Sequence, residues 1–362
     1  MLPLVKTLLP PKEILMPELE QVLYSGYISQ GDAVESFEYN FKKFIGSGYT
    51  LSVNSGTAAL HIALILANVK EGDEVISTPL TAEPTNVAIK MTGAKIKWAD
   101  IDYKTGGISP VSIENNINSK TKAIVFVDYA GIPNNIKAIK EISTKYNIPV
   151  IEDAAHALGA KYNGLKLGNH FPYTIFSFQA IKHLTTIDGG VLQLQDEELY
   201  KKAKKIRWFG IDKGISRLQN NIEFQGYKYH MNNVNATIGL VQLRTIENII
   251  DLYIDNGRYY DENLKNTNGI ELIDYYEDSE PSYWLYTLKV ENRSDFIKKM
   301  EENGIMASEV HKRNDFHTFL NDFPTKLPNL DRFYKKMVHL PCGWWVKKED
   351  REKIVELIQK GW

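Results

Sequence analysis

The chain has 362 residues, of which 43% are hydrophobic, and a formal net charge of −2, so it is long enough to bury a substantial core in two domains. Its basic residues are spread along the chain rather than massed, a pattern that argues against nucleic-acid binding. The single cysteine, Cys342, excludes an intramolecular disulfide framework and has no zinc-ligand spacing around it, so we expect no metal site and a reducing compartment such as the cytoplasm.

The N-terminal segment MLPLVKTLLPPKEIL lacks the uninterrupted apolar core of a signal peptide, because Pro3, Pro10, Pro11 and an early charge interrupt it. No apolar run approaches the roughly 18 residues of a membrane span, so we expect a cytoplasmic protein with no membrane partner. Two amphipathic helices are predicted next, over residues 11–23 and 34–45. They are joined by SGYISQGD, a loop that is either a plain connector or part of a site.

The helix after the first predicted strand begins with small residues. The strand, over residues 49–53, runs into NSGTAALHIALILANV, which places Ser55, Gly56 and Thr57 at a helix N-terminus. Free backbone N–H groups, the positive end of the helix dipole and a hydroxyl together make an anion site there. The same residues also fit an ordinary helix N-cap, and this segment alone leaves both interpretations open.

Alternating strands and helices indicate an α/β fold. The strands EVIST, KIKWAD and KAIVFVD precede helices near residues 82–91, 110–117 and 134–146. The strands are mostly continuous apolar runs, which is typical of a sheet covered by helices on both faces. We therefore predict a mostly parallel sheet with right-handed crossovers, in which ligands bind beyond the carboxyl ends of the strands.

Two acidic residues and a histidine follow the next buried strand, which spans residues 149–151. They are Glu152, Asp153 and His156, and the two alanines between them leave room for a flat group against the backbone. Asp153 could serve as a helix N-cap. If the cofactor is pyridoxal phosphate, the same carboxylate would instead keep the pyridine nitrogen protonated and so make the ring an electron sink.

A single lysine stands in the middle of TIFSFQAIKHLTTIDGG. Ile175 and Phe176 predict a buried strand, and VLQL after the paired glycines predicts another, so Lys182 lies on the loop between two strands. A lysine held on such a loop, near serine and threonine hydroxyls, suits Schiff-base formation with an aldehyde cofactor. Taken alone, the pattern also fits a solvated surface lysine.

The last part of the chain changes pattern. The predicted elements are a helix over 196–208, the segment GYKYHMNN, one long helix from about 234 to 264, strands ELIDYY and YWLYTLKV, a helix over 294–303, a strand near 306–310 and a closing helix over 349–360. This order is typical of an α+β domain. We therefore predict a large α/β domain over residues 1–245 and a smaller α+β domain over residues 246–362.

Four motifs in register give the chain a family resemblance. VNSGTAALHIAL, VIEDAAHALGA, SFQAIKHLTTIDGG and GYKYHMNNVNATIGLVQL occur in an order and spacing that resemble the DegT/StrS family of pyridoxal-phosphate-dependent sugar aminotransferases. The similarity runs from SGYISQGDAVESFE to HLPCGWW and the closing helix. It implies an aspartate-aminotransferase-like fold, the type I fold of pyridoxal phosphate enzymes, in the large domain.

The resemblance assigns roles to individual residues. Lys182, five positions after Ser177, falls on the family's Schiff-base lysine; a dehydratase branch has histidine at this position, so lysine there, with His183 beside it, implies transamination. Ser177, Gly56 and Thr57 match positions that hold the cofactor phosphate. Asp153 matches the partner of the pyridine nitrogen. His156 stands where many members have a glutamine that contacts the ring hydroxyl.

Some positions depart from the family pattern. Ala82 aligns with the aromatic residue that usually stacks on the cofactor ring, a contact worth on the order of 1 kcal/mol. Lys228 and His230 stand where asparagine and arginine are more common. Lys228 would meet the phosphate of the neighbouring subunit as a point charge. The residues expected to contact the substrate are Ser29, His183, Tyr229 and His230.

The resemblance predicts an enzyme that takes an amino group, from L-glutamate, onto pyridoxal phosphate and passes through pyridoxamine phosphate. The expected acceptor is a nucleotide-linked 3-keto or 4-keto deoxysugar for surface polysaccharide or glycan biosynthesis, in a homodimer whose active sites lie at the subunit interface. No motif identifies a base or diphosphate site, so a smaller phosphorylated ketone stays open as the acceptor. A regulator that keeps the fold without turnover is the alternative from another class.

Overall fold

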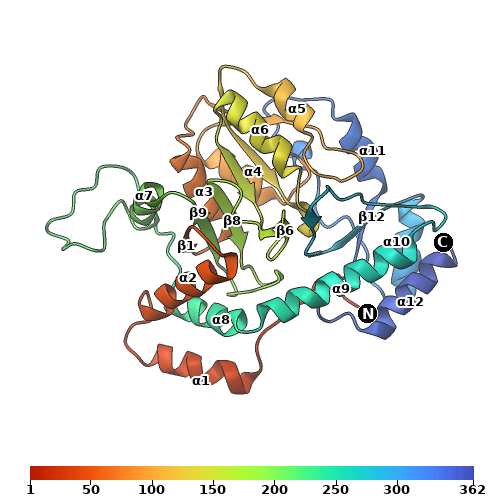
Figure 1. Ribbon diagram of the computed structural model, residues 1–362, viewed down its shortest axis with the longest axis horizontal. Coiled ribbons are helices and arrows are strands. Elements are labelled where there is room, and N and C mark those ends of the chain that lie inside the picture. The colour runs from red at the N-terminus through yellow and green to blue at the C-terminus, as the bar shows by residue number, and fades with distance from the viewer.

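A seven-stranded sheet forms the centre of the protein in a computed structural model that describes residues 1–362 (Figure 1). Its order is β1-β9-β8-β5-β4-β2-β3. The strands are β1 (Tyr49–Val53), β2 (Glu74–Ser77), β3 (Lys95–Trp98), β4 (Thr121–Val127), β5 (Val150–Asp153), β8 (Tyr173–Ser177) and β9 (Gly190–Leu194). Pairings β2 with β3, β2 with β4, β4 with β5 and β5 with β8 are parallel, and only those that involve β9 are antiparallel. The predicted mostly parallel sheet is confirmed.

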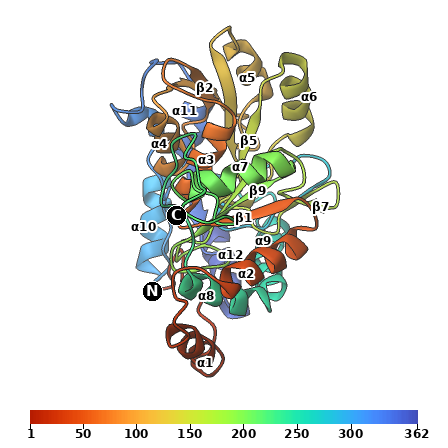
Figure 2. The ribbon, with the colours of Figure 1, turned by 90° about the vertical axis from the view of Figure 1, so that its left-hand side faces the viewer.

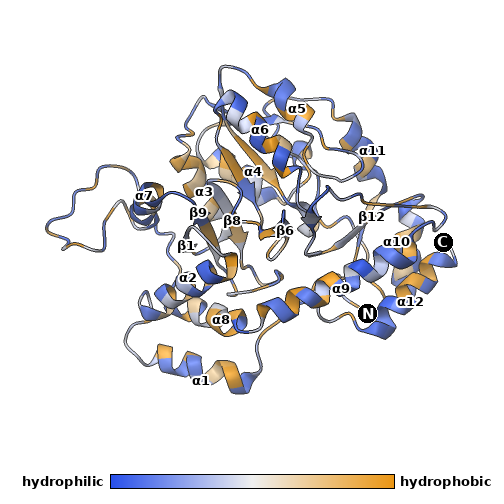
Figure 3. Cartoon of the chain, in the orientation of Figure 1, coloured by the Kyte–Doolittle hydropathy of each residue, from blue (hydrophilic) through white to orange (hydrophobic).

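Helices cover both faces of this sheet. They include α3 (Gly56–Leu66), α4 (Glu83–Met91), α5 (Pro110–Asn116), α6 (Ile136–Tyr146) and α7 (Glu197–Arg207). Successive residues of β4 enter two different cores: Val125 packs in one cluster with residues of α3, while Phe126 packs in the other with residues of α6. Because both faces are buried, the central strands are mostly apolar, as the hydropathy colouring shows (Figure 3).

Below the sheet in the view of Figure 1 lie helices α1 (Lys12–Leu23), α2 (Asp32–Ile45) and α8 (Asn233–Leu243). Leu15 of α1 packs against Ile238 and Val241 of α8. The loop after α7, over residues 209–226, extends away from the body of the protein, and the turned view places α1 at the opposite extremity from α5 and α6 (Figures 1 and 2).

The single long helix predicted over residues 234–264 is wrong, because α8 ends at Leu243 and α9 (Ile246–Leu264) begins after Thr245. Thr245 leaves the helical conformation, with φ −130° and ψ 7°. The Gln242 side chain binds both backbone groups of Thr185, with Oε1 accepting at 3.1 Å and Nε2 donating at 2.6 Å. These bonds fix the end of α8 against the loop between β8 and β9. Helix α9 leaves in a new direction that apolar periodicity does not reveal.

The C-terminal part contains a three-stranded antiparallel sheet and its helices. The strands are β10 (Ile270–Leu272), β12 (Tyr286–Val290) and β13 (Met337–Leu340), and the helices are α10 (Arg293–Glu302), α11 (Pro328–Lys336) and α12 (Lys348–Gln359). The strand predicted near 306–310 is wrong: Ser308 makes only an isolated bridge, and Val310 has φ +60°, which ends extended backbone. A third, small sheet joins β6 (Lys161–Tyr162), β7 (Leu165–Lys166) and β11 (Ser279–Glu280).

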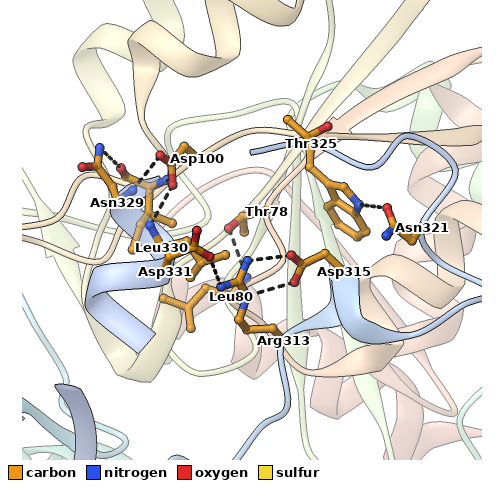
Figure 4. Close-up of polar contacts among 12 residues, drawn as sticks. Thr78, Leu80, Asp100, Arg313, Asp315, Asn321, Thr325, Asn329, Leu330 and Asp331 are labelled. Atoms are coloured by element: carbon orange, nitrogen blue, oxygen red, sulfur yellow. Dashed lines mark hydrogen bonds and ion pairs between the residues drawn. The ribbon is translucent and has the colours of Figure 1, made fainter. Parts of the chain in front are cut away.

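A polar cluster attaches the segment before α11 to the central sheet (Figure 4). The buried Arg313 pairs with Asp315 at 2.6 Å and with Asp331 at 2.5 Å. The Asp100 carboxylate, just after β3, accepts hydrogen bonds from the backbone N–H groups of Asn329 and Leu330. The contacts of Arg313 and Asp100 hold the residues just before Arg313 close to the carboxyl ends of the strands.

None of the helices is both long and apolar enough to cross a membrane.

Candidate active site

A cavity of about 400 Å³ opens beyond the carboxyl ends of three neighbouring parallel strands. Val127, Asp153 and Ser177, the last residues of β4, β5 and β8, all line it. The start of α3, the start of α4, the loop between β8 and β9 and two residues of the C-terminal part complete its wall. The predicted position of the ligand site relative to the sheet therefore coincides with a cavity large enough for a cofactor.

Lys182 lies on the loop between β8 and β9, as predicted, and its side chain enters the cavity. Burial lowers the pKa of its amine to about 7, although the nearby Asp153 carboxylate opposes this shift. Its Nζ lies 3.9 Å from the centroid of the Trp284 ring. An amine with this pKa is neutral in a large fraction of molecules near neutral pH, whereas an exposed lysine is almost entirely protonated there.

Asp153 is a buried carboxylate with two internal donors. The Thr85 hydroxyl donates to Oδ2 at 2.8 Å, and the Ala155 N–H donates to Oδ1 at 3.1 Å. Burial raises the pKa of Asp153, while these hydrogen bonds and the charge of Lys182 oppose the shift. Asp153 is not an N-cap of a regular helix, since no helix begins after β5.

The first turn of α3 faces Ser177 across a very short gap. Ser55 is the N-cap, and its hydroxyl accepts a hydrogen bond from the Ala58 N–H at 3.1 Å. Gly56 and Thr57 follow, with N–H groups that have no acceptor within the helix. A Cβ on Gly56 would lie 3.1 Å from the Ser177 Cβ. The N-cap interpretation therefore holds for Ser55. The backbone N–H groups of Gly56 and Thr57 lie beside the cavity without an acceptor in the helix.

His156 is buried at the back of the cavity. Its Nδ1 accepts a hydrogen bond from the Ala130 N–H at 3.4 Å, and its ring stacks on Trp284 with centroids 4.0 Å apart. Burial holds the pKa of His156 well below its usual value. The imidazole is therefore neutral, and because Nδ1 is an acceptor, its proton is on Nε2.

Thr85, Trp284 and His311 are among the cavity residues that were not identified from the sequence. Thr85 orients Asp153 and lies in the same segment as Ala82, which also lines the cavity. Burial lowers the pKa of His311 to about 4, and its buried Nε2 has no hydrogen-bond partner. No local signal marks Trp284 or His311, because the contacts that place them join segments far apart in the chain.

Five predicted site residues lie outside this cavity. Ser29 and His230 lie together, with Oγ 3.3 Å from Nε2. Tyr229 contacts His61, with its OH 3.2 Å from Nδ1. Lys228 is exposed, and its backbone forms a bridge with Trp208. His183 is buried on the far side of the loop, where Nε2 lies 3.1 Å from the Ser282 carbonyl oxygen.

Comparison with known proteins identifies relatives over the whole chain. A model of the DegT/DnrJ/EryC1/StrS aminotransferase family matches residues 12–359. The spore coat polysaccharide biosynthesis protein SpsC of Bacillus subtilis is 31% identical over 364 residues, which cover 94% of this chain and 92% of SpsC.

Solved structures give the same result. AtS13 from Actinomadura melliaura has a TM-score of 0.97 and 40% identity, with 100% of this chain and 99% of AtS13 covered. The sugar aminotransferase CalS13 from Micromonospora echinospora has a TM-score of 0.96 and 35% identity, with both chains fully covered. The putative sugar aminotransferase Spr1654 from Streptococcus pneumoniae, 26% identical with a TM-score of 0.90 over 99% of this chain and 98% of its own, was solved in PMP and PLP forms. The chain therefore belongs to the DegT/DnrJ/EryC1/StrS aminotransferase family, as its four motifs predict.

Proposed function

We propose that the protein is a pyridoxal-phosphate-dependent transaminase that moves an amino group from L-glutamate to a keto sugar carried on a nucleotide. The observation that carries this proposal is a lysine amine of pKa about 7 in one cavity with a buried carboxylate. The names of CalS13 and SpsC, a sugar aminotransferase and a polysaccharide biosynthesis protein, support a sugar acceptor in glycan biosynthesis.

The residues of the cavity fit pyridoxal phosphate by their chemistry. A buried carboxylate, Asp153, suits a protonated ring nitrogen. The free amides of Gly56 and Thr57, with the Ser177 hydroxyl opposite, suit an anion such as a phosphate. The Nε2 proton of His156 suits the ring hydroxyl. When bound, the cofactor supplies an electron-withdrawing ring that stabilises a carbanion.

Lys182 and Asp153 each have a task in amino transfer. Lys182 would anchor the cofactor, and its free amine would accept and return a proton at Nζ during the transfer. Because its pKa is about 7, the amine can both accept and return this proton near neutral pH. Asp153 keeps its orientation through Thr85 and Ala155, so its charge is directed at one position.

The phosphate needs a cation that this cavity does not supply. Lys182 is the only lysine or arginine among the residues that line it, and that amine is committed to the reaction. We propose that the working unit is a homodimer in which Lys228 of each chain, exposed on its own subunit, meets the phosphate of the other site. The same arrangement would bring Ser29, Tyr229 and His230 to the substrate of the neighbouring subunit.

A spectroscopic experiment tests the proposed function. The purified protein should be yellow, and addition of L-glutamate should bleach the colour and release 2-oxoglutarate. A nucleotide-linked keto sugar should then restore the colour as the amino sugar forms. The variant Lys182→Ala should lose this cycle, whereas Lys70→Ala, which removes an exposed lysine that does not line the cavity, should retain it. Bleaching by L-glutamate at the wild-type rate in Lys182→Ala would contradict the proposal.

A further inference from the structure

Trp284 makes two contacts at the active-site lysine and a third with His156. Its indole N–H donates to the carbonyl oxygen of Ile181 at 2.9 Å, one residue before Lys182. Its ring centroid lies 3.9 Å from the Lys182 Nζ. His156 stacks on the same indole with centroids 4.0 Å apart and planes inclined by 25°. Only 1% of Trp284 is exposed, so its own position is fixed by packing.

We propose that Trp284 is the positioning residue for Lys182, whose ammonium rests against the indole face whenever the amine is not bonded to the cofactor. The inference rests on the proposed role of Lys182 and adds a group that neither the motifs nor the names of the relatives assign. Trp284 reaches the site from the segment just before β12, so it ties the reactive loop to the C-terminal part of the chain.

An aromatic face suits this task better than a carboxylate. A carboxylate in contact with the amine would favour the ammonium strongly and raise its pKa, which would make the amine a poor carrier at neutral pH. A ring face attracts the ammonium through its quadrupole, and indole is the strongest of the aromatic side chains in this respect. The Lys182 amine has no hydrogen-bond partner in the cavity, so the indole is the group that directs it.

The second contact of Trp284 fixes the backbone under the same lysine. Its N–H donates to the Ile181 carbonyl oxygen, next to the Lys182 backbone, and its ring face contacts the Lys182 Nζ. One rigid ring therefore restrains both ends of the Lys182 side chain. A long lysine otherwise has many rotamers, and restricting them keeps Nζ at the reacting atoms.

The pKa of the Lys182 amine measures the contact directly. The full-length chain, freed of cofactor, is labelled with an amine-specific acylating reagent over a range of pH, and mass spectrometry quantifies the fraction modified at Lys182. Trp284→Leu removes the ring face, so the pKa of Lys182 should fall below the wild-type value by about one unit. Trp344→Leu is the matched control, because Trp344 is half-buried against Lys6 and does not line the cavity, so its loss should leave the pKa of Lys182 unchanged.

Fluorinated tryptophan at position 284 separates the effect of the ring's quadrupole on the pKa of Lys182 from the effect of the ring's packing. Successive fluorine atoms weaken the quadrupole while the shape and the N–H donor remain, so the pKa of Lys182 should fall in steps with the number of fluorine atoms. This series also decides the matter if Trp284→Leu fails to fold. A pKa of Lys182 that stays at the wild-type value in the fluorinated series overturns the inference. Because labelling requires no turnover, failure of the inference can be told from failure of the proposed transaminase function.

Discussion

Burial acts in opposite directions on the two ionisable groups at the centre of the site. It lowers the pKa of the Lys182 amine and raises the pKa of the Asp153 carboxyl, because a low dielectric disfavours charge of either sign. Each group opposes the shift of the other through its charge. The pair is therefore sensitive to whatever enters the cavity, and a cationic ring nitrogen would favour the charged form of Asp153.

The pKa of Lys182 predicts a pH dependence for the donor half of the reaction. The amine must be neutral to accept a proton, and at one pH unit below its pKa only about one-tenth of it is neutral. The single-turnover rate of bleaching by L-glutamate should therefore fall about tenfold per pH unit below about pH 7 and level off above it. Glutamate deuterated at the α-carbon should react more slowly if proton transfer limits the rate. A rate independent of pH over this range would show that another group carries the proton.

Replacing Asp153 with asparagine should slow the chemistry while the cofactor stays bound. The amide has no negative charge to keep the ring nitrogen protonated, so the single-turnover rate with L-glutamate should fall by at least about 10²-fold. The graded control is Thr85→Val, which leaves the carboxylate but removes the hydroxyl that donates to Oδ2. Its rate should fall by about tenfold. Equal rates in wild type and Asp153→Asn, measured by stopped-flow absorbance, would place the partner of the ring nitrogen elsewhere.

At the scale of elements, the site depends on the close approach of β9 and α3. A Cβ on Gly190, the first residue of β9, would lie 2.7 Å from the Gly56 nitrogen and 2.7 Å from the Ser55 carbonyl carbon. These are backbone atoms, so they cannot move aside as a side chain could. The antiparallel pairing of β9 with both β1 and β8 fixes its position from two sides. Glycine at this position allows the first turn of α3 to reach Ser177.

Gly190→Ala should therefore displace the start of α3 and weaken cofactor binding. Overpacking of this kind costs about 1–3 kcal/mol, so we expect a cofactor Kd raised by about tenfold or more, together with a lower Tm. Cofactor titration followed by fluorescence and a thermal melt measure the two effects. Gly72→Ala is the control: it has φ +89° and open space around the new methyl group. It should lower the free energy of unfolding by about 1 kcal/mol without changing the cofactor Kd.

The sequence predicted elements well where one local pattern decides them. The bounds predicted for β1, residues 49–53, are the observed ones, because a short apolar run between turn residues leaves few alternatives. The break between α8 and α9 was not predictable, since it depends on Gln242 binding Thr185. The strand β13 was missed because only four residues, after a lysine-rich helix end, form it.

The residues of the candidate site were also predictable only in part. Asp153 and Ser177 stand at the ends of strands, and Lys182 stands on the loop after Ser177. All three were identifiable from motifs, and the structure brings them into one cavity. His183 was assigned to the substrate because it is adjacent to Lys182, yet its side chain lies buried against Tyr253, with ring centroids 4.5 Å apart. Its role toward the substrate stays a prediction. Trp284 could not be found, because only the folded chain places it at the lysine.

At the scale of the whole molecule, the proposed homodimer predicts complementation between two defective chains. Lys182→Ala lacks the reactive amine, and Lys228→Ala lacks the cation that meets the partner's phosphate. If the phosphate contact crosses the interface, a mixed dimer has one site with both lysines and one with neither. After subunit exchange, activity should rise above that of either parent. No rise, with exchange confirmed by mass spectrometry, would place Lys228 in its own chain's site or outside any site.

The Leu2 backbone binds both Gly304 and Met306, with N–H···O distances of 2.6 and 3.0 Å. Leu2 therefore has these partners only after residues 304–306 have been synthesised. Lys182 is in the same situation, since Trp284 follows it by about a hundred residues. A nascent chain folds from its N-terminal part first, so the reactive lysine is exposed to solvent until the C-terminal part covers it. A chain cut short between Lys182 and Trp284 would therefore carry the amine without its cover.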